Sequence, residues 1–245
     1  SEPVLDERRK RYLDAMGVPL YIRRTPEAVG VADAPTAGPA QAPGSDISRG
    51  RDDLYPDEVA NLGWEALKAR VAGCTACELH RGRHNTVFGV GNEDADLMVV
   101  GEAPGADEDR QGEPFVGRAG QLLNAMLRAI GFGRGDVYIA NILKCRPPAN
   151  RNPVAAEVAC CLPFLARQIE LVRPRLILSV GGVSAHNLLE TEEPVGRLRG
   201  RVHAFGPARI PVVVSYHPAY LLRKPGEKAK AWQDLLAARR LLDAK

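Results

Sequence analysis

Four short apolar segments recur along the chain, and stretches with helically spaced apolar residues separate them. The segments lie at 97–101, 137–143, 176–181 and 210–216. Short runs without polar alternation are typical of strands buried on both faces, as in a parallel sheet. The helices that would cover these faces are expected at 120–130, 155–172, 184–189 and 228–242. We therefore expect an α/β fold with three α/β/α layers around a central, mostly parallel four-stranded sheet.

The first 53 residues differ in character from the rest of the chain. Residues 1–24 contain helically spaced apolar residues, which predict a short helical segment. Residues 25–53 are rich in Ala, Pro and Gly, so they cannot bury enough apolar surface to offset their ordering entropy. We expect a flexible linker there and a catalytic domain at 54–245, since a chain of 245 residues has room for one or two domains.

The composition excludes several classes of protein. Apolar residues make up 45% and charged residues 26% of the chain, which is ordinary for a soluble globular protein. No apolar run approaches the ~18 residues that a membrane-spanning helix needs. The charged start lacks the apolar core of a secretory signal, so we expect a cytoplasmic location. The net charge of +3 permits nucleic-acid binding without requiring it.

Polar and glycine residues follow the four predicted strands at the point where each strand ends. They are the run from Gly101 to Gly105, Asn141, the pair Gly181–Gly182, and His217. In open α/β sheets, ligands bind at the carboxyl ends of the strands. The sequence therefore predicts a site at this edge, where a carboxylate, an amide, a glycine turn and an imidazole meet.

The five cysteines offer sulfur ligands for a metal centre. Cys74 and Cys77 have the C-x2-C spacing of metal-binding pairs, while Cys145, Cys160 and Cys161 follow later. Without a secretory signal a disulfide framework is not expected. A C-x2-C pair and two further thiols indicate a four-sulfur site for zinc or for an iron–sulfur cluster. Cys160 and Cys161 are helix neighbours, so we expect only one of them to be a ligand.

Three sequence blocks resemble a known family. They are VGEAPGADEDRQGEPFVGRAGQLL at 100–123, NILKCRPPANRNP at 141–153 and YHPAYLLR at 216–223. They are similar to the family 4 uracil-DNA glycosylases, iron–sulfur enzymes of base-excision repair, and the similarity runs from about residue 64 to the end. It implies a [4Fe-4S] cluster on four of the cysteines, leaving Cys160 free. The implied ligands are Cys74, Cys77, Cys145 and Cys161.

The resemblance also implies a partner and an activity. Uracil would be released from DNA by hydrolysis of its N-glycosidic bond, leaving an abasic site, and with no lysine placed as a nucleophile no lyase step is expected. The cluster would be structural, since this hydrolysis needs no electron transfer. We expect a monomer that associates with the nucleoid through DNA. The extension at 1–53 either serves as a spacer or tethers a replication or repair protein.

Each implied pocket residue has a chemical role. A stacked base cannot be reached in duplex DNA, so the nucleotide must flip out, and Phe115 would stack on it. Asn141 would read the O4 and N3–H groups of uracil, because its amide offers both a donor and an acceptor. His217 would donate a hydrogen bond to O2 of uracil, where negative charge develops as the base leaves.

Two carboxylates are candidates for orienting water or offsetting positive charge on the sugar. Glu102 is the first choice and Glu108 the second. Related glycosylases carry an Asp immediately before the Pro of the first block, where this chain has Ala103. The rest of that block would contribute to substrate binding through Gly101, Ala103, Pro104 and Gly105.

Four further residues are candidates for contacts with DNA. Leu221 would enter the base stack as a wedge, and Arg223 would meet phosphate. Lys144 is expected to contact phosphate as well. Ser184, after the glycine pair, could bring phosphate to a helix N-terminus.

Two other interpretations compete with a glycosylase. One is a relative that binds or covalently traps uracil-DNA; such relatives carry a nucleophilic His in the loop after the Asn-bearing strand. The stretch between Cys145 and Cys161 contains no His, which argues against trapping. The other is a non-catalytic iron–sulfur module that binds nucleic acid.

Overall fold

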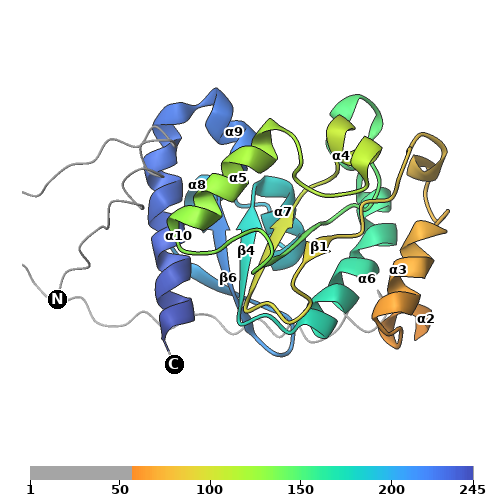
Figure 1. Ribbon diagram of the computed structural model, residues 1–245, viewed down its shortest axis with the longest axis horizontal. Coiled ribbons are helices and arrows are strands. Elements are labelled where there is room, and N and C mark those ends of the chain that lie inside the picture. Colours follow the sequence, from red (N-terminus) through yellow and green to blue (C-terminus); the bar gives the residue numbers. More distant parts are fainter. Residues whose placement is uncertain (1–56, 245) are drawn as a thin grey trace, which may run out of the picture.

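The computed structural model describes residues 57–244, and Figure 1 shows their arrangement. The segments expected at 1–24 and 25–53 lie outside the described residues, so the expected domain boundaries remain predictions. Among the described helices, none is long and apolar enough to cross a membrane.

A six-stranded sheet forms the centre of the molecule. Its four parallel strands are β2 (Leu97–Gly101), β3 (Tyr138–Asn141), β4 (Leu176–Val180) and β6 (Ile210–Ser215). The strands follow the order β1-β3-β2-β4-β6-β5. The expected mostly parallel sheet is confirmed, and its four parallel strands coincide with the four apolar segments.

The two additional strands, β1 (Val90–Gly91) and β5 (Val202–Phe205), pair antiparallel at the two edges of the sheet. The expectation of four strands therefore missed both edges. β1 has only two residues, and β5 is exposed or half-buried along its length. Neither segment carries the continuous apolar run that marks a strand buried on both faces.

Helices cover both faces of the sheet, as a three-layer fold requires (Figure 1). One buried cluster joins α3 (Trp64–Ala72), α6 (Ala155–Val172) and α7 (Gly182–Leu189) to one face. The other joins α5 (Arg118–Ala129) and α10 (Lys228–Asp243) to the opposite face. Successive strand residues alternate between the clusters: Met98 and Val100 belong to the first, Leu97 and Val99 to the second.

Short helices complete the chain. The helix expected near residues 56–71 is divided into α2 (Asp57–Ala60) and α3, because Gly63 stands before α3 with an extended backbone. Three short helices were not expected at all, namely α4 (Ala106–Gln111), α8 (Val195–Leu198) and α9 (Pro218–Arg223). Two of them, α4 and α9, directly follow parallel strands β2 and β6 and border the same end of the sheet.

The strand register sets the site. Gly101 pairs with Asn141 at the carboxyl ends of β2 and β3. Val180 and Ser215 pair at the ends of β4 and β6, two residues before His217. The predicted polar residues thus follow adjacent strands at one edge of the sheet.

Candidate active site

A cavity of about 430 Å³ opens at the carboxyl ends of the parallel strands. It brings together the β2–α4 segment, the loop before α5, the end of β3, the β3–α6 loop and the start of α9. The predicted residues that line it are Glu102, Ala103, Pro104, Gly105, Glu108, Phe115, Asn141, His217 and Arg223. Residues from four separate sequence blocks therefore share one pocket.

Phe115 is held in an unusual backbone conformation beside this cavity. Its φ is 54°, in the left-handed region that non-glycine residues seldom occupy. Arg134 holds the loop, because its guanidinium donates to the carbonyl oxygens of Pro114 and Phe115. Gly120 permits the tight path, since a Cβ there would collide with the Phe115 carbonyl. Contacts on several sides thus fix the orientation of the buried aromatic ring.

Glu108 anchors the same loop from α4. Its Oε1 accepts hydrogen bonds from the backbone N–H groups of Val116 (2.9 Å) and Gly117 (3.1 Å). Its Oε2 accepts from the N–H of Gly105 at 3.1 Å. Both oxygens of this second-choice carboxylate are therefore engaged by backbone donors. These contacts suit a residue that shapes the pocket better than one that activates water.

Asn141 ends β3 with its side chain nearly inaccessible to solvent. Its Oδ1 is buried and has no hydrogen-bond partner among the described residues. An unpaired buried amide oxygen costs about 1–3 kcal/mol. Gly101 lies directly beside it, and a Cβ on Gly101 would press against both Oδ1 of Asn141 and the ring of Phe115. An acceptor that is left unpaired in the wall of a cavity is positioned for a ligand donor.

His217 lies against Phe115, with 5.6 Å between ring centroids and 30° between ring planes. Its Nδ1 accepts a hydrogen bond from the Ala219 N–H at 3.1 Å. A ring nitrogen that accepts carries no proton, so the neutral ring carries its proton on Nε2. Burial, assisted by the positive charge of Arg223, lowers the pKa of His217 to about 4. The ring is thus a neutral Nε2–H donor at physiological pH.

Gly181 makes room for this histidine. Its φ of 99° is available to glycine, and a Cβ there would come within 3.1 Å of the His217 Cβ. The predicted glycine turn therefore shapes the histidine's surroundings. Ser184, by contrast, is fully buried in α7, where its hydroxyl donates to the Val100 carbonyl. The expected phosphate contact of Ser184 is therefore wrong for its side chain.

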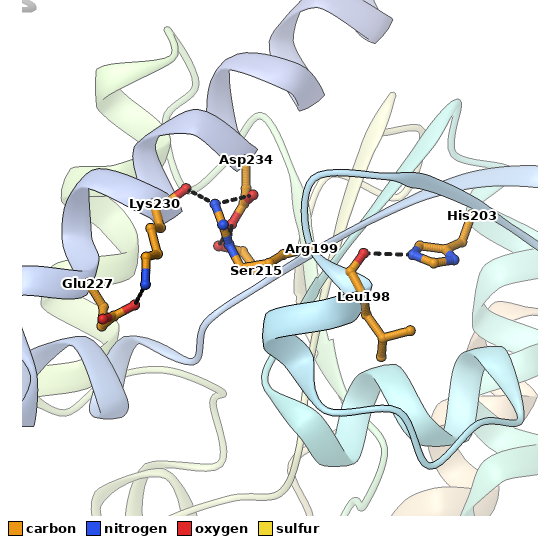
Figure 2. A network of polar contacts seen from close by, with 7 residues as sticks. All are labelled: Leu198, Arg199, His203, Ser215, Glu227, Lys230 and Asp234. Carbon is orange, nitrogen blue, oxygen red and sulfur yellow. Dashed lines mark hydrogen bonds and ion pairs between the residues drawn. The ribbon is translucent and has the colours of Figure 1, made fainter. Parts of the chain in front are cut away.

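A network of charged side chains supports the end of β6 just before His217 (Figure 2). The buried carboxylate of Asp234 accepts hydrogen bonds from the Ser215 hydroxyl at 2.9 Å and from the Arg199 guanidinium at 2.9 and 3.1 Å. Arg199 also lies over the ring of Tyr216. The ion pair joins α10 to the segment before β5, and its serine contact ties both to the strand that leads to His217.

Glu102 follows β2 and lines the cavity. Burial raises the pKa of its carboxyl above the usual value. No side-chain hydrogen bond within the described part of the chain occupies it, unlike Glu108. Glu102 is therefore the carboxylate with capacity left for water or substrate.

Two other expected DNA contacts are contradicted by burial. Leu221 is fully buried against α5 and α10, so it cannot enter a base stack from this position. Its neighbour Leu222 is 37% exposed. Lys144 is also buried: its ammonium donates to the Asn141 carbonyl at 2.8 Å and to Oε1 of Gln168 at 2.6 Å, so it does not face DNA.

The β3–α6 loop contributes lining residues that the sequence interpretation did not single out. They are Pro147, Asn150, Arg151 and Asn152. Ala149 and Asn150 both have positive φ values, and Arg146 donates to Oδ1 of Asn150 at 2.8 Å. The only local signal was the Pro-Pro and Asn-rich composition of RPPANRNP, which predicts a turn but not the direction of its side chains.

All five cysteines line a second cavity, between α3, the end of β3 and α6. Burial raises the pKa of Cys161 to about 12 and also raises those of Cys77 and Cys145. Buried thiols of this kind become thiolates when a metal supplies positive charge. Four sulfurs from separated segments, converging in one cavity, fit the donor set of an iron–sulfur cluster.

Arg83 and the Lys144 backbone support this cysteine cavity. Arg83 donates to Sγ of Cys145 at 3.2 Å and to the Cys74 carbonyl at 2.8 Å. The Lys144 N–H donates to Sγ of Cys161 at 3.4 Å. The described residues contain no group of three or more His, Cys, Asp or Glu side chains arranged for a single metal ion. A cluster of several irons spreads its ligands more widely than one ion does.

Comparison with known proteins agrees with this geometry. The family model of the uracil DNA glycosylase superfamily matches residues 88–236. A type-4 uracil-DNA glycosylase of Pyrobaculum aerophilum is 42% identical over 177 residues, covering 70% of this chain and 90% of the relative. One from Archaeoglobus fulgidus is 47% identical over 162 residues, covering 63% and 81%. One from Thermotoga maritima is 44% identical over 161 residues, covering 65% and 83%.

Proposed function

This chain belongs to the uracil-DNA glycosylase superfamily, and we propose that it is a type-4 enzyme that removes uracil from DNA in base-excision repair. The observation that carries the proposal is the unpaired Oδ1 of Asn141 in a cavity shared with Phe115 and His217. Uracil offers an N–H donor, an O4 acceptor and an O2 acceptor on one ring. Those groups complement an amide oxygen, an amide N–H and an imidazole N–H.

Recognition would begin when the uracil nucleotide leaves the DNA stack and enters the cavity. The ring of Phe115 supplies an apolar stacking surface, worth about 1–3 kcal/mol for a base. Oδ1 of Asn141 accepts from N3–H of uracil, while Nδ2 donates to O4. Cytosine has no N3–H and carries an amino group in place of O4, so the same amide disfavours it.

Bond cleavage would depend on His217. As the bond between N1 and the sugar C1′ breaks, its electron pair moves onto the uracil ring and negative charge develops on O2. The neutral Nε2–H donates to that oxygen, stabilising the transition state more than the bound substrate. The Ala219 N–H holds Nδ1 and so keeps the donor aimed without a proton transfer to the base.

Glu102 would assist the incoming water. The water oxygen forms a bond to C1′, and the Glu102 carboxylate accepts a water proton as that bond forms. Because Glu108 is occupied by three backbone N–H groups, it acts by holding the loop of Phe115. The products are free uracil and an abasic site, with no covalent protein–DNA intermediate.

Cys74, Cys77, Cys145 and Cys161 would hold a [4Fe-4S] cluster. When bound, the cluster supplies iron–thiolate bonds that tie the α3 segment, the end of β3 and α6 together. Cys145 lies four residues beyond Asn141. The cluster would therefore stabilise the end of the strand that reads the base.

The test is an end-labelled oligonucleotide that carries one uracil, with a thymine oligonucleotide as control. After incubation with iron-loaded protein, hot alkali breaks any abasic site, and a denaturing gel separates the strands. Cleavage only at uracil is expected. An intact uracil strand from iron-loaded protein would overturn the proposal, and an adduct stable to SDS would point to covalent trapping instead.

A further inference from the structure

Two arginines line the active-site cavity from opposite loops. Arg223 ends α9, and Arg151 lies in the β3–α6 loop. The groups that would read the base, Asn141 and Phe115, are buried, whereas both arginines are exposed. The arginines therefore occupy the solvent side of the cavity. A neutral base does not require two cations there.

Arg151 is held in one orientation by a buried carboxylate. Its Nη1 and Nη2 donate to the two oxygens of Glu157 at 2.9 and 2.6 Å, forming a bidentate ion pair. Glu157 is itself fixed, because its Oε2 accepts from the Val154 N–H at 3.0 Å. The guanidinium also donates to the Asn152 carbonyl at 3.0 Å. The side chain is thus ordered in advance of any ligand.

The guanidinium still has donors to spare. A guanidinium carries five N–H groups, and the described residues engage Nη1 twice and Nη2 once. The Nε–H and one Nη2–H have no partner in the described part of the chain. A guanidinium with two remaining donors matches the oxygens of a phosphate.

The flanking residues on both sides suggest that a polymer crosses the cavity. Large exposed apolar side chains are few in the described residues: Val154, Val202 and Leu222. Two of them stand beside the cavity arginines, Leu222 next to Arg223 and Val154 three residues after Arg151. Each side of the cavity therefore presents one cation and one exposed apolar group, the combination that meets phosphate and unstacked bases.

We propose that Arg151 binds a backbone phosphate of DNA on the side of the cavity opposite Arg223, so that the strand is held on both sides of the flipped nucleotide. This proposal rests on the proposed function for the identity of the polymer. Glu157 acts as the positioning residue for Arg151. The β3–α6 loop thus forms a second DNA-binding edge, separate from α9.

The experiment measures DNA affinity between 50 and 200 mM KCl by fluorescence anisotropy. The probes are a uracil-free duplex and a duplex with one 2′-fluoro-2′-deoxyuridine, which resists hydrolysis. Loss of one phosphate contact lowers the slope of log affinity against log salt by about 0.9. Arg151→Ala should show this decrease on both probes and lose about 5- to 20-fold in affinity at low salt. Its single-turnover excision rate at saturating protein should fall by less than its affinity.

Matched variants separate a phosphate contact from a general charge effect. Arg128→Ala removes an exposed arginine from the last turn of α5, at the other end of the sheet, and should keep the wild-type slope. The double variant Arg151→Gln/Glu157→Gln leaves the net charge unchanged and removes the buried carboxylate that Arg151→Ala would leave unpaired. It should show the same lower slope as Arg151→Ala.

Two results would overturn the proposal. One is a wild-type slope and affinity in both Arg151 variants. The other is an excision rate at saturation that falls while affinity does not, which would place Arg151 in the chemistry. A lower slope in a protein that leaves uracil strands intact would keep the phosphate site and refute only the glycosylase activity.

Discussion

The backbone of Gly101 lies against the side-chain amide of Asn141. A methyl group on Gly101 would come within 2.6 Å of Cζ of Phe115 and closer still to Oδ1 of Asn141. Both contacts are shorter than those that real Cβ atoms make. The last residue of β2 must therefore be glycine for the reading amide and the stacking ring to share one wall.

The substitution Gly101→Ala tests this close approach. We expect at least about 100-fold lower kcat/KM on uracil-DNA, because Asn141 and Phe115 must both move, and a loss of about 1–3 kcal/mol in the free energy of unfolding from overpacking. Steady-state kinetics and urea unfolding measure the two effects. Gly135→Ala is the control, since a Cβ there meets nothing within 4 Å. A Gly101→Ala enzyme with wild-type kinetics would refute the proposed arrangement.

Asn141→Leu should separate function from stability. The variant loses both amide hydrogen bonds to uracil, so kcat/KM should fall by about 10- to 200-fold at roughly 1–1.5 kcal/mol per bond. It also removes a buried oxygen that has no partner in the described structure, so Tm should stay the same or rise. A variant that loses several degrees of Tm along with its activity would show that the amide has a structural role instead.

The neutral state of His217 predicts a flat histidine contribution to the pH profile. With a pKa of about 4, this side chain should not titrate between pH 5.5 and 8. In ¹⁵N-histidine NMR spectra, Nδ1 should therefore keep the shift of an unprotonated ring nitrogen across that range, with His217→Ala assigning the signal. A titration midpoint near 6.5 would contradict the buried, neutral ring.

His217→Ala also has a kinetic consequence. Loss of one preorganised donor to a developing oxyanion typically costs 10²–10³-fold in rate. We expect that decrease in single-turnover excision, with DNA affinity largely retained. Equal losses in affinity and rate would place His217 in ground-state binding.

Glu102 should govern the acidic side of the activity profile. Burial raises its pKa, and the ionised form is the one that accepts a water proton. Activity should therefore be lost as the pH falls through this raised pKa, at a higher pH than for an exposed glutamate. Glu102→Gln should be about 10²–10³-fold slower near neutrality and should lack this acidic decline. Iron content measured at each pH controls for loss of the cluster.

Cys160 and Cys161 give a matched pair for the cluster. Cys161 is buried and its Sγ accepts from the Lys144 N–H, whereas Cys160 is half-buried and its Sγ donates to the Ala76 carbonyl. Cys161→Ser should lose iron, visible absorbance and Tm together, while Cys160→Ser should keep all three. The opposite result would make Cys160 the fourth ligand.

The sequence was most informative where local pattern and burial coincide. Continuous apolar runs marked the parallel strands, and polar residues such as Asn141 and His217 stood out because they follow those runs directly. The edge strands β1 and β5 escaped detection because they are short or partly exposed. The antiparallel pairing of these edges depends on neighbours distant in sequence.

Burial of single side chains was the part that sequence could not provide. Leu221 and Leu222 are adjacent in a six-residue helix, and only packing against α5 decides which of them is buried. Lys144 and Ser184 have polar side chains that suggested the surface, yet Gln168 and Val100 satisfy them inside the protein. Arg151 was missed because its direction depends on Glu157, one turn into the next helix.

The chain passes from Asn141 to Cys145 in four residues, with the buried ammonium of Lys144 on the Asn141 carbonyl between them. If those cysteines hold the cluster as proposed, a newly made polypeptide completes the base-reading edge of its pocket only after it has received iron. The cell's capacity to clear uracil from its genome would then follow its iron supply rather than the number of polypeptides synthesised.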